Sequence, residues 1–219
     1  HDGNKICISD RENTITLVDG HKYTELRKHK APSTTKIHSF KWTNDDKYIV
    51  ATTKDGFVKI FDANHLEKVH EFQAHCGNCF CIDIASNNQY LATGGADSMI
   101  TIFDVDTLIQ KYGLIPFETA VNCLSFNFNN KLIASSSDDY FIDISYIDDA
   151  KSKTMQCMRI NTKSAVHALR WHPSKHMLAY CGYPDSSNSS MINTGSSSND
   201  EANNSAANVN IWGLLRPRM

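Results

Sequence analysis

The sequence predicts an all-β fold in which four-stranded units form the blades of a β-propeller. The first observation is an internal repeat, whose copies lie at residues 48–62, 90–104 and 132–144. One position of the repeat holds Asp55, Asp97 and Asp139, so the period is 42 residues. A period of this length is typical of stacked supersecondary units, and four strands per unit is the pattern of a propeller blade.

Each copy of the repeat predicts strands rather than helices. Apolar residues alternate with polar ones along the third strand of the unit, which gives one apolar face with a period of two. The alternating pairs are Val58 and Ile60, Ile100 and Ile102, and Ile142 and Ile144. Turn residues follow the first strand of each unit at 43–46, 86–88, 127–130 and 172–175. Residues 1–5 predict the turn before a second strand at 6–9, so we expect the chain to begin within a blade.

The polar residues of the repeat resemble those of the WD-repeat family. In that family a histidine before the first strand, a serine or threonine in the second, an aspartate in the next turn and a tryptophan in the third share hydrogen bonds. His75, Thr93 and Asp97 match the first three positions, while Phe103 stands at the tryptophan position. The resemblance therefore implies a structural network of these three residues in this blade.

The next blade keeps only half of this signature. Ser135 and Asp139 match the family pattern and are expected to form its structural network, but Phe117 stands at the histidine position and Ser145 at the tryptophan position. The last blade has Trp212 in place, with Ala206 where the aspartate would be. The similarity to the family thus rests on period and apolar pattern more than on the signature residues.

A narrower resemblance, to the WD-repeat subunits of THO/TREX mRNA-export complexes, rests on residues 73–82, 134–144 and 165–173. The run Asp-Tyr-Phe-Ile-Asp-Ile at 139–144 is specific, because an aspartate in the middle of a third strand is unusual in WD repeats. This resemblance extends from Lys5 to Trp212, apart from one insertion. It implies a non-catalytic, nuclear interaction scaffold that couples transcription elongation to mRNA processing and export. The implied partners are large helical THO subunits and, through them, a DEAD-box RNA-dependent ATPase and mRNA.

A second hypothesis is a WD-repeat substrate receptor of a ubiquitin ligase. Such receptors resemble one another in a Trp-Asp-x-Arg motif at the end of the third strand. The corresponding residues are 61–64, Phe-Asp-Ala-Asn, and 103–106, Phe-Asp-Val-Asp, and neither segment has the arginine. The missing arginine favours the THO/TREX hypothesis over the ligase hypothesis.

The length of the chain predicts fewer blades than a closed propeller of this kind contains. Without the insertion, about 195 residues at 42 per blade make four to five blades of an expected seven. Closure removes the free sheet edges of this architecture. We therefore expect residues 1–219 to be a partial propeller, with two or three blades preceding it.

Composition and motifs limit the kind of function. The net charge is −2, 21% of residues are charged and no long apolar run is present, which predicts neither a membrane span nor a signal peptide. A nucleic-acid-binding domain is more often strongly basic. No nucleophile elbow, phosphate-binding glycine loop or metalloprotease helix is found, so we expect no catalytic residue, no cofactor and no small-molecule substrate.

Two clusters of cysteine and histidine contain residue types that can bind a metal ion. His75, Cys76, Cys79 and Cys81 have ligand chemistry, but Cys79 and Cys81 lie two apart on one strand and point the same way, and no second Cys-x-x-Cys follows. His167, His172 and His176 fit no single ligand face. We expect structural roles for both groups, and we expect Cys7, Cys81, Cys123 and Cys181 to be small buried residues of strands.

Chain geometry predicts which loops share a face of the molecule. In an up-and-down blade, the loop that enters the first strand and the turn between the second and third strands lie at one end, where binding residues concentrate. Lys54, Asp138 and Tyr140 lie in these turns and are the candidate partner contacts. Ordinary solvated turns are the alternative interpretation of these positions.

Two segments stand outside the repeat pattern. Residues 184–207 form a low-complexity insertion between the second and third strands of the last blade, rich in serine and asparagine, and we expect it to be disordered. Residues 22–36 are the most basic stretch. This segment has two possible interpretations: a weak contact with RNA phosphates, or a solvated loop followed by an outer strand.

Overall fold

The structure of this protein is a computed structural model that describes residues 3–31, 35–148, 153–182 and 208–213. The insertion 184–207, including Ala206, lies outside the described residues. Within the described residues the chain forms antiparallel strands in five sheets. The first sheet contains β1 (Lys5–Ser9), β2 (Thr14–Asp19) and β3 (Glu25–Lys30). The second contains β4 (Ile37–Trp42), β5 (Tyr48–Thr53), β6 (Phe57–Asp62) and β7 (Lys68–Gln73).

The later sheets repeat this order. The third sheet contains β8 (Cys79–Ile84), β9 (Tyr90–Gly95), β10 (Ile100–Asp104) and β11 (Gln110–Leu114). The fourth contains β12 (Val121–Phe126), β13 (Leu132–Ser137), β14 (Phe141–Asp148) and β15 (Lys153–Asn161). The fifth contains β16 (Val166–Trp171), β17 (Met177–Gly182) and β18 (Asn208–Gly213). Sequential strands are hydrogen-bonded neighbours in every sheet, which confirms the predicted all-β architecture of propeller blades.

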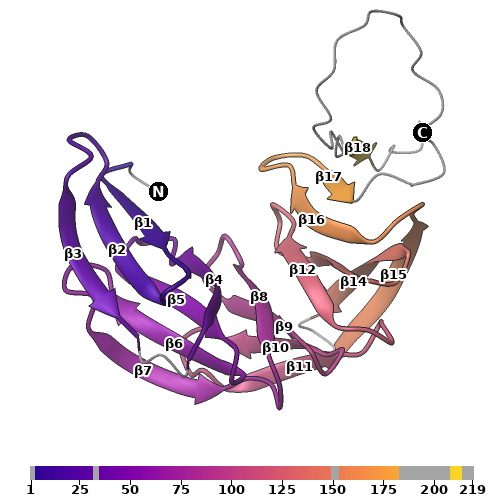
Figure 1. Ribbon diagram of the computed structural model, residues 1–219. Helices are drawn as coiled ribbons and strands as arrows, with labels where there is room; N and C mark the ends of the chain where they lie inside the picture. The colour runs from indigo at the N-terminus through magenta and orange to yellow at the C-terminus, as the bar shows by residue number, and fades with distance from the viewer. Residues whose placement is uncertain (1–2, 32–34, 149–152, 183–207, 214–219) are drawn as a thin grey trace, which may run out of the picture.

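The five sheets follow one another around an arc (Figure 1). The first strands β4, β8, β12 and β16 lie on its inner side, and the last strands β3, β7, β11 and β15 lie on its outer side (Figure 1). Apolar clusters fill the spaces between neighbouring sheets, where each fully buried aliphatic side chain contributes about 2 kcal/mol. Examples from the successive spaces are Leu17 with Phe61, Val58 with Ile82, Ile102 with Leu124, and Ile144 with Leu169.

The ends of the strands form two rims. We call first rim the loops that enter the first strands together with the turns between second and third strands. Backbone hydrogen bonds join these two kinds of segment, from Lys54 N to Lys36 O at 2.7 Å and from Ala96 N to Asn78 O at 2.8 Å. We call second rim the remaining turns. They are joined in the same way, for example from Val105 N to Gln89 O at 3.0 Å.

The turns of the second rim connect neighbouring sheets. Asp46, Asn88 and Asn130 occupy one position of the repeat and have φ angles of 56°, 58° and 60°, a conformation that aspartate and asparagine tolerate better than other non-glycine residues. Asn44 Nδ2 donates to Asn88 Oδ1 at 2.8 Å, and Ser86 N donates to Asn130 Oδ1 at 2.8 Å. Hydrogen bonds from side chains of this rim therefore join each sheet to the next.

A β-bulge recurs near the start of each first strand. The register shifts at His38 in β4, Phe80 in β8, Asn122 in β12 and His167 in β16. A bulge redirects the side chain of its extra residue. At Asn122 the redirected amide reaches the first rim, where it donates to the Asp138 carboxylate at 2.7 Å.

The expectation that four cysteines are buried is only partly right. Cys81 is buried, whereas Cys7, Cys123 and Cys181 are half-buried. Cys7 and Cys181 belong to the sheets at the two ends of the arc, which have a described neighbour on one side only. Cys123 adjoins the bulge of β12.

Candidate partner-binding rim

The first rim of the third sheet contains a closed polar network. His75 enters from the loop before β8, and its Nδ1 lies 2.9 Å from Asp97 Oδ1, while its Nε2 lies 2.9 Å from Thr93 Oγ1. A carboxylate only accepts hydrogen bonds, so Nδ1 carries the proton and donates to Asp97. In the neutral ring Nε2 then accepts a hydrogen bond from the Thr93 hydroxyl. The structure thus brings together the three residues that the sequence assigned to this network. His75 and Thr93 are buried, while the Asp97 carboxylate is partly exposed at the rim.

Gly95 makes this network possible. A Cβ at this position would lie 2.5 Å from His75 Nδ1 and 2.7 Å from Asp97 Oδ1, distances that real side chains do not adopt. The imidazole therefore packs directly against the glycine backbone. Forty-two positions later the residue is Ser137, and the fourth sheet has no histidine to accommodate.

The first rim of the fourth sheet is held in another way. Phe117 stacks on Phe141, with ring centroids 5.1 Å apart. The Asp139 carboxylate accepts from Glu118 N at 3.0 Å, while Ser137 Oγ accepts from Asp139 N at 3.0 Å. Asp139 therefore joins its turn to the loop that enters β12. Among the described residues Ser135 and Asp139 are not linked by a hydrogen bond, because Phe117 stands where His75 bridges Thr93 and Asp97, and the Asp139 carboxylate accepts from the neighbouring loop instead.

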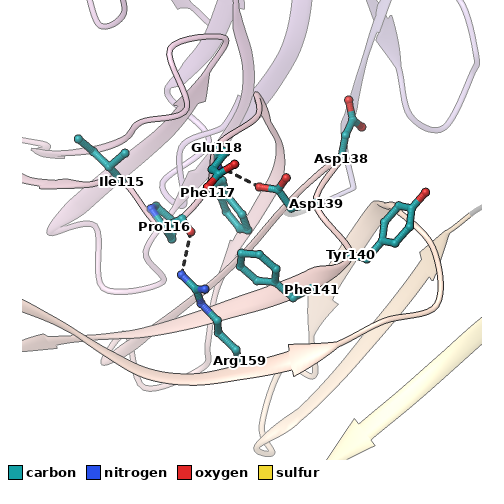
Figure 2. A pocket seen from close by; sticks show the side chains of 9 residues that line it. All are labelled: Ile115, Pro116, Phe117, Glu118, Asp138, Asp139, Tyr140, Phe141 and Arg159. Atoms are coloured by element: carbon teal, nitrogen blue, oxygen red, sulfur yellow. Dashed lines mark hydrogen bonds between the residues drawn. The ribbon is translucent and has the colours of Figure 1, made fainter.

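An open hollow of about 710 Å³ lies on the first rim beside this aromatic pair. Figure 2 shows its nine lining residues, with the Phe117–Phe141 pair in the middle and Ile115 and Tyr140 on opposite sides. The remaining residues of the lining are Pro116, Glu118, Asp138, Asp139 and Arg159. The hollow therefore contains two of the candidate contacts, Asp138 and Tyr140, both of which are exposed.

Lys54, the third candidate contact, lies elsewhere on the first rim. It occupies the corresponding turn of the second sheet, between β5 and β6, and its side chain is exposed. Burial, together with the charges of Lys36 and Lys54, lowers the pKa of His38. The structure thus groups Lys54 with two other basic residues and separates it by a whole sheet from the hollow.

A buried aspartate supports the wall of the hollow. Asp143, in the middle of β14, is only 1% exposed, and its carboxylate accepts from Ser145 Oγ at 2.8 Å and from Gln156 Nε2. It also pairs with Arg159, whose Nε lies 3.7 Å from Asp143 Oδ1. The unusual aspartate was visible in the sequence, but its partners on β15 were not, because their pairing depends on the register between the two strands.

The guanidinium of Arg159 connects this aspartate to the surface. Its Cζ lies 4.3 Å from the centroid of the Phe141 ring, and its Nη2 donates to Pro116 O at 3.0 Å (Figure 2). A guanidinium over an aromatic face is a favourable cation–π contact. One arginine thereby fixes both the aromatic floor and the loop before β12.

A second group missed from the sequence lies on the inner strands. Asp83 of β8 is 4% exposed, and its Oδ1 lies 2.5 Å from Lys41 Nζ on β4 and 3.4 Å from Arg170 Nη1 on β16. Its Oδ2 accepts from Phe126 N on β12 at 2.8 Å. One carboxylate thus ties the first strands of four sheets together. Lys41 and Asp83 are one 42-residue period apart in the sequence, but predicting their contact would have required the curvature of the arc.

The histidine and cysteine clusters take structural positions. Cys79 is buried in β8, and burial raises the pKa of its thiol to about 12. His176 lies against Phe128, with ring centroids 4.8 Å apart, and His172 Nδ1 accepts from Ser174 N at 3.1 Å. In the part of the chain that the structure describes, no three histidine, cysteine or acidic side chains are grouped to hold a metal ion. The same part contains no helix with the length and apolarity needed to cross a membrane.

Comparison with known proteins identifies the family. The model of the WD domain, G-beta repeat, matches residues 20–62, 66–104 and 113–142, which together make up half of the chain. The chain belongs to the WD-repeat family. This confirms the family that the repeat and its polar residues predicted.

The chain is similar to several characterised proteins. It is 27% identical over 181 residues to "THO complex subunit 3" of Arabidopsis thaliana, covering 83% of this chain and 56% of that protein. It is 32% identical over 81 residues to a guanine nucleotide-binding protein subunit beta of Oryza sativa subsp. indica, covering 37% of this chain and 21% of that protein. The chain therefore spans little more than half of the THO subunit's length.

A solved structure shows the same fold. A chain in the crystal structure of the mitotic checkpoint complex superposes with a TM-score of 0.73 and 18% sequence identity, over 84% of this chain and 55% of that chain. At this identity the similarity shows the propeller fold alone.

Proposed function

We propose that this protein is a non-catalytic interaction subunit of a THO-type assembly. The observation that carries the proposal is the similarity to THO complex subunit 3, which extends over 83% of the chain, whereas the similarity to the G-protein subunit covers 37%. This similarity extends over 181 residues, which is more than four periods of the 42-residue repeat. In this role the protein acts in the nucleus and couples transcription to mRNA processing and export.

The partners in this proposal are the large helical subunits of the assembly. A DEAD-box RNA-dependent ATPase and mRNA are reached through those subunits rather than through this protein directly. Lys54, Asp138 and Tyr140 contact the partners from the first rim, because all three are exposed there. The second rim is a weaker candidate surface, since its asparagine side chains already connect the sheets.

Affinity purification of the protein from its native cells tests this proposal. We expect the helical THO subunits to be recovered as stable partners when the bound proteins are identified by mass spectrometry. Recovery of a cullin adaptor instead would overturn the proposal in favour of a ubiquitin-ligase substrate receptor.

Two charge-reversal variants identify the rim that carries the contact. Lys54→Glu with Asp138→Lys changes the first rim, and Lys131→Glu with Asp106→Lys changes the second, and each keeps the net charge constant. All four side chains are exposed, so stability should change by less than about 0.5 kcal/mol. We expect partner recovery to fall for the first variant alone, since rim charges select partners. Loss with the second variant alone would place the contact on the opposite rim.

A further inference from the structure

The hollow on the fourth sheet exposes apolar surface on both sides. Ile115 is 69% exposed and Tyr140 is 64% exposed, and they flank the Phe117–Phe141 pair (Figure 2). Thr162 N donates to Tyr140 O at 2.9 Å, so the backbone of the tyrosine is fixed while its ring remains in solvent. Exposed apolar groups beside a concavity are typical of a protein-interaction site.

The charge around the hollow is one-sided. Three carboxylates line it, those of Glu118, Asp138 and Asp139, against the single guanidinium of Arg159. That guanidinium is already shared between Asp143, the Phe141 ring and Pro116 O. In the described part of the chain none of the three lining carboxylates forms an ion pair with a lysine, arginine or histidine. Negative charge therefore remains available to a ligand.

We propose that this hollow binds a short segment of a partner protein that carries a lysine or arginine beside an aliphatic side chain. The aliphatic group contacts Ile115 and the edge of the aromatic floor. The cation lies between the Tyr140 ring and the Asp138 carboxylate, where a cation–π contact and an ion pair reinforce each other. Because Arg159 is anchored at three points, the floor is in place before the ligand arrives and little ordering cost is added on binding.

Two other occupants fit the charge poorly. The insertion at 184–207 contains Asp185, Asp200 and Glu201 but no lysine or arginine. RNA would bring phosphates toward three carboxylates, which repel them. A basic and apolar protein segment is therefore the occupant that the hollow favours.

The corresponding positions of the third sheet lack this chemistry. Forty-two residues before Ile115, Glu118, Asp138 and Tyr140 stand Gln73, Cys76, Ala96 and Ser98. None of these four carries a charge or a large apolar side chain. The third sheet therefore lacks the charged and apolar side chains on which the proposed site depends.

Selection from a display library of random short peptides on the purified full chain tests the proposal. We expect enrichment of sequences with lysine or arginine next to leucine, isoleucine, valine or methionine. An enriched peptide, made synthetically with a fluorescent label, should lose about tenfold in affinity for Asp138→Asn with Tyr140→Ala. The matched control is Asp106→Asn with Ile109→Ala on the second rim, which removes one exposed carboxylate and a side chain that is 65% exposed, and it should bind as the wild type does.

Several outcomes would overturn the proposal. The selection could give no enrichment, or it could enrich sequences without a basic residue. The two variants could lose peptide affinity equally, or the hollow variant alone could lose binding to single-stranded RNA. Circular dichroism of both variants checks that the fold is retained. The site proposal rests on the proposed function for its biological setting only, because peptide selection uses the purified chain. Failed selection with recovered THO subunits would reject the hollow alone, and the reverse result would reject the THO assignment alone.

Discussion

The third and fourth sheets place different chemistry on the same repeat positions. In the third sheet, His75, Thr93 and Asp97 form a closed network at the first rim. In the fourth, Phe117 replaces the histidine, and the buried polar group lies deeper, at Asp143 of β14, where the third sheet has Thr101. Moving the polar network away from the rim leaves the fourth sheet with exposed acidic and apolar side chains around an open hollow.

This difference teaches how one repeat can provide both stability and binding. A rim whose polar groups hydrogen-bond with one another has few unpaired polar groups with which to bind a partner. A rim supported from below, by Asp143 through Arg159, keeps its shape while Asp138 and Asp139 accept hydrogen bonds but form no ion pair among the described residues. The two sheets can therefore be compared by substitutions at matching positions.

The largest effect is expected from Asp143→Ala. The change leaves the buried Ser145 hydroxyl without its acceptor and removes the carboxylate that the exposed Gln156 and Arg159 share, so three interactions are lost together and the free energy of unfolding should fall by about 2–3 kcal/mol. Denaturant unfolding followed by circular dichroism measures it. Thr101→Val at the matching position should cost less than about 1 kcal/mol, and equal costs at the two positions would contradict the assignment of a buried network to the fourth sheet.

A smaller effect separates the two turn aspartates. Asp97→Ala leaves His75 Nδ1 without an acceptor near the core and should cost about 1–3 kcal/mol, whereas Asp139→Ala removes one bond to an exposed backbone N–H and should cost about 1 kcal/mol or less. Thermal unfolding of the two variants provides the comparison. If Asp139→Ala proved the more damaging change, the rim of the fourth sheet would be the more tightly locked of the two.

Thiol reactivity gives the smallest and most local comparison. Burial raises the pKa of Cys79 in the third sheet to about 12 and that of Cys123 in the fourth to about 11, against an ordinary value of 9.0. Because the thiolate is the reactive form, alkylation with iodoacetamide at pH 9 should modify the exposed Cys76 and Cys157 before the half-buried Cys123, and the buried Cys79 after all three. Mass spectrometry of timed samples gives the order, and early modification of Cys79 would show that the third sheet opens locally.

The same thiols make stability depend on alkaline pH. Their folded pKa values lie above the unfolded one, so their contribution is complete below pH 9 and is lost as the pH rises toward 12. A melting temperature that stays constant over this interval would contradict the burial of these groups.

The sequence predicted the sheets well because their order depends on local patterns. The 42-residue period, the alternation in Val58 and Ile60 and the turn at 43–46 each act over a few residues, and the structure confirms the strands that they indicate. The grouping of His75, Thr93 and Asp97 could be proposed because the family resemblance supplied the pattern. Cysteine burial was harder to predict, since Cys7 and Cys181 lie in the sheets at the ends of the arc.

The hollow was only half predictable. The sequence indicates Asp138 and Tyr140 because they lie in a turn, but Ile115 and Arg159 come from other segments and reach the site through tertiary packing. The contact of Arg159 with Asp143 depends on strand register, and the contact of Asp83 with Arg170 depends on how four sheets curve together. Neither relation is encoded in a short stretch of sequence.

The most direct test of the account separates stability from binding in one experiment. Asp138→Ala with Tyr140→Ser gives the fourth-sheet turn the residues that the third sheet has at Ala96 and Ser98. We predict that this variant unfolds within about 0.5 kcal/mol of the wild type yet recovers about fivefold less partner protein from cells. Asp97→Ala should do the reverse, with lower stability and undiminished partner recovery below its melting temperature. Full partner recovery by the first variant, or loss of partner by the second while it remains folded, would contradict the division of roles between the two sheets.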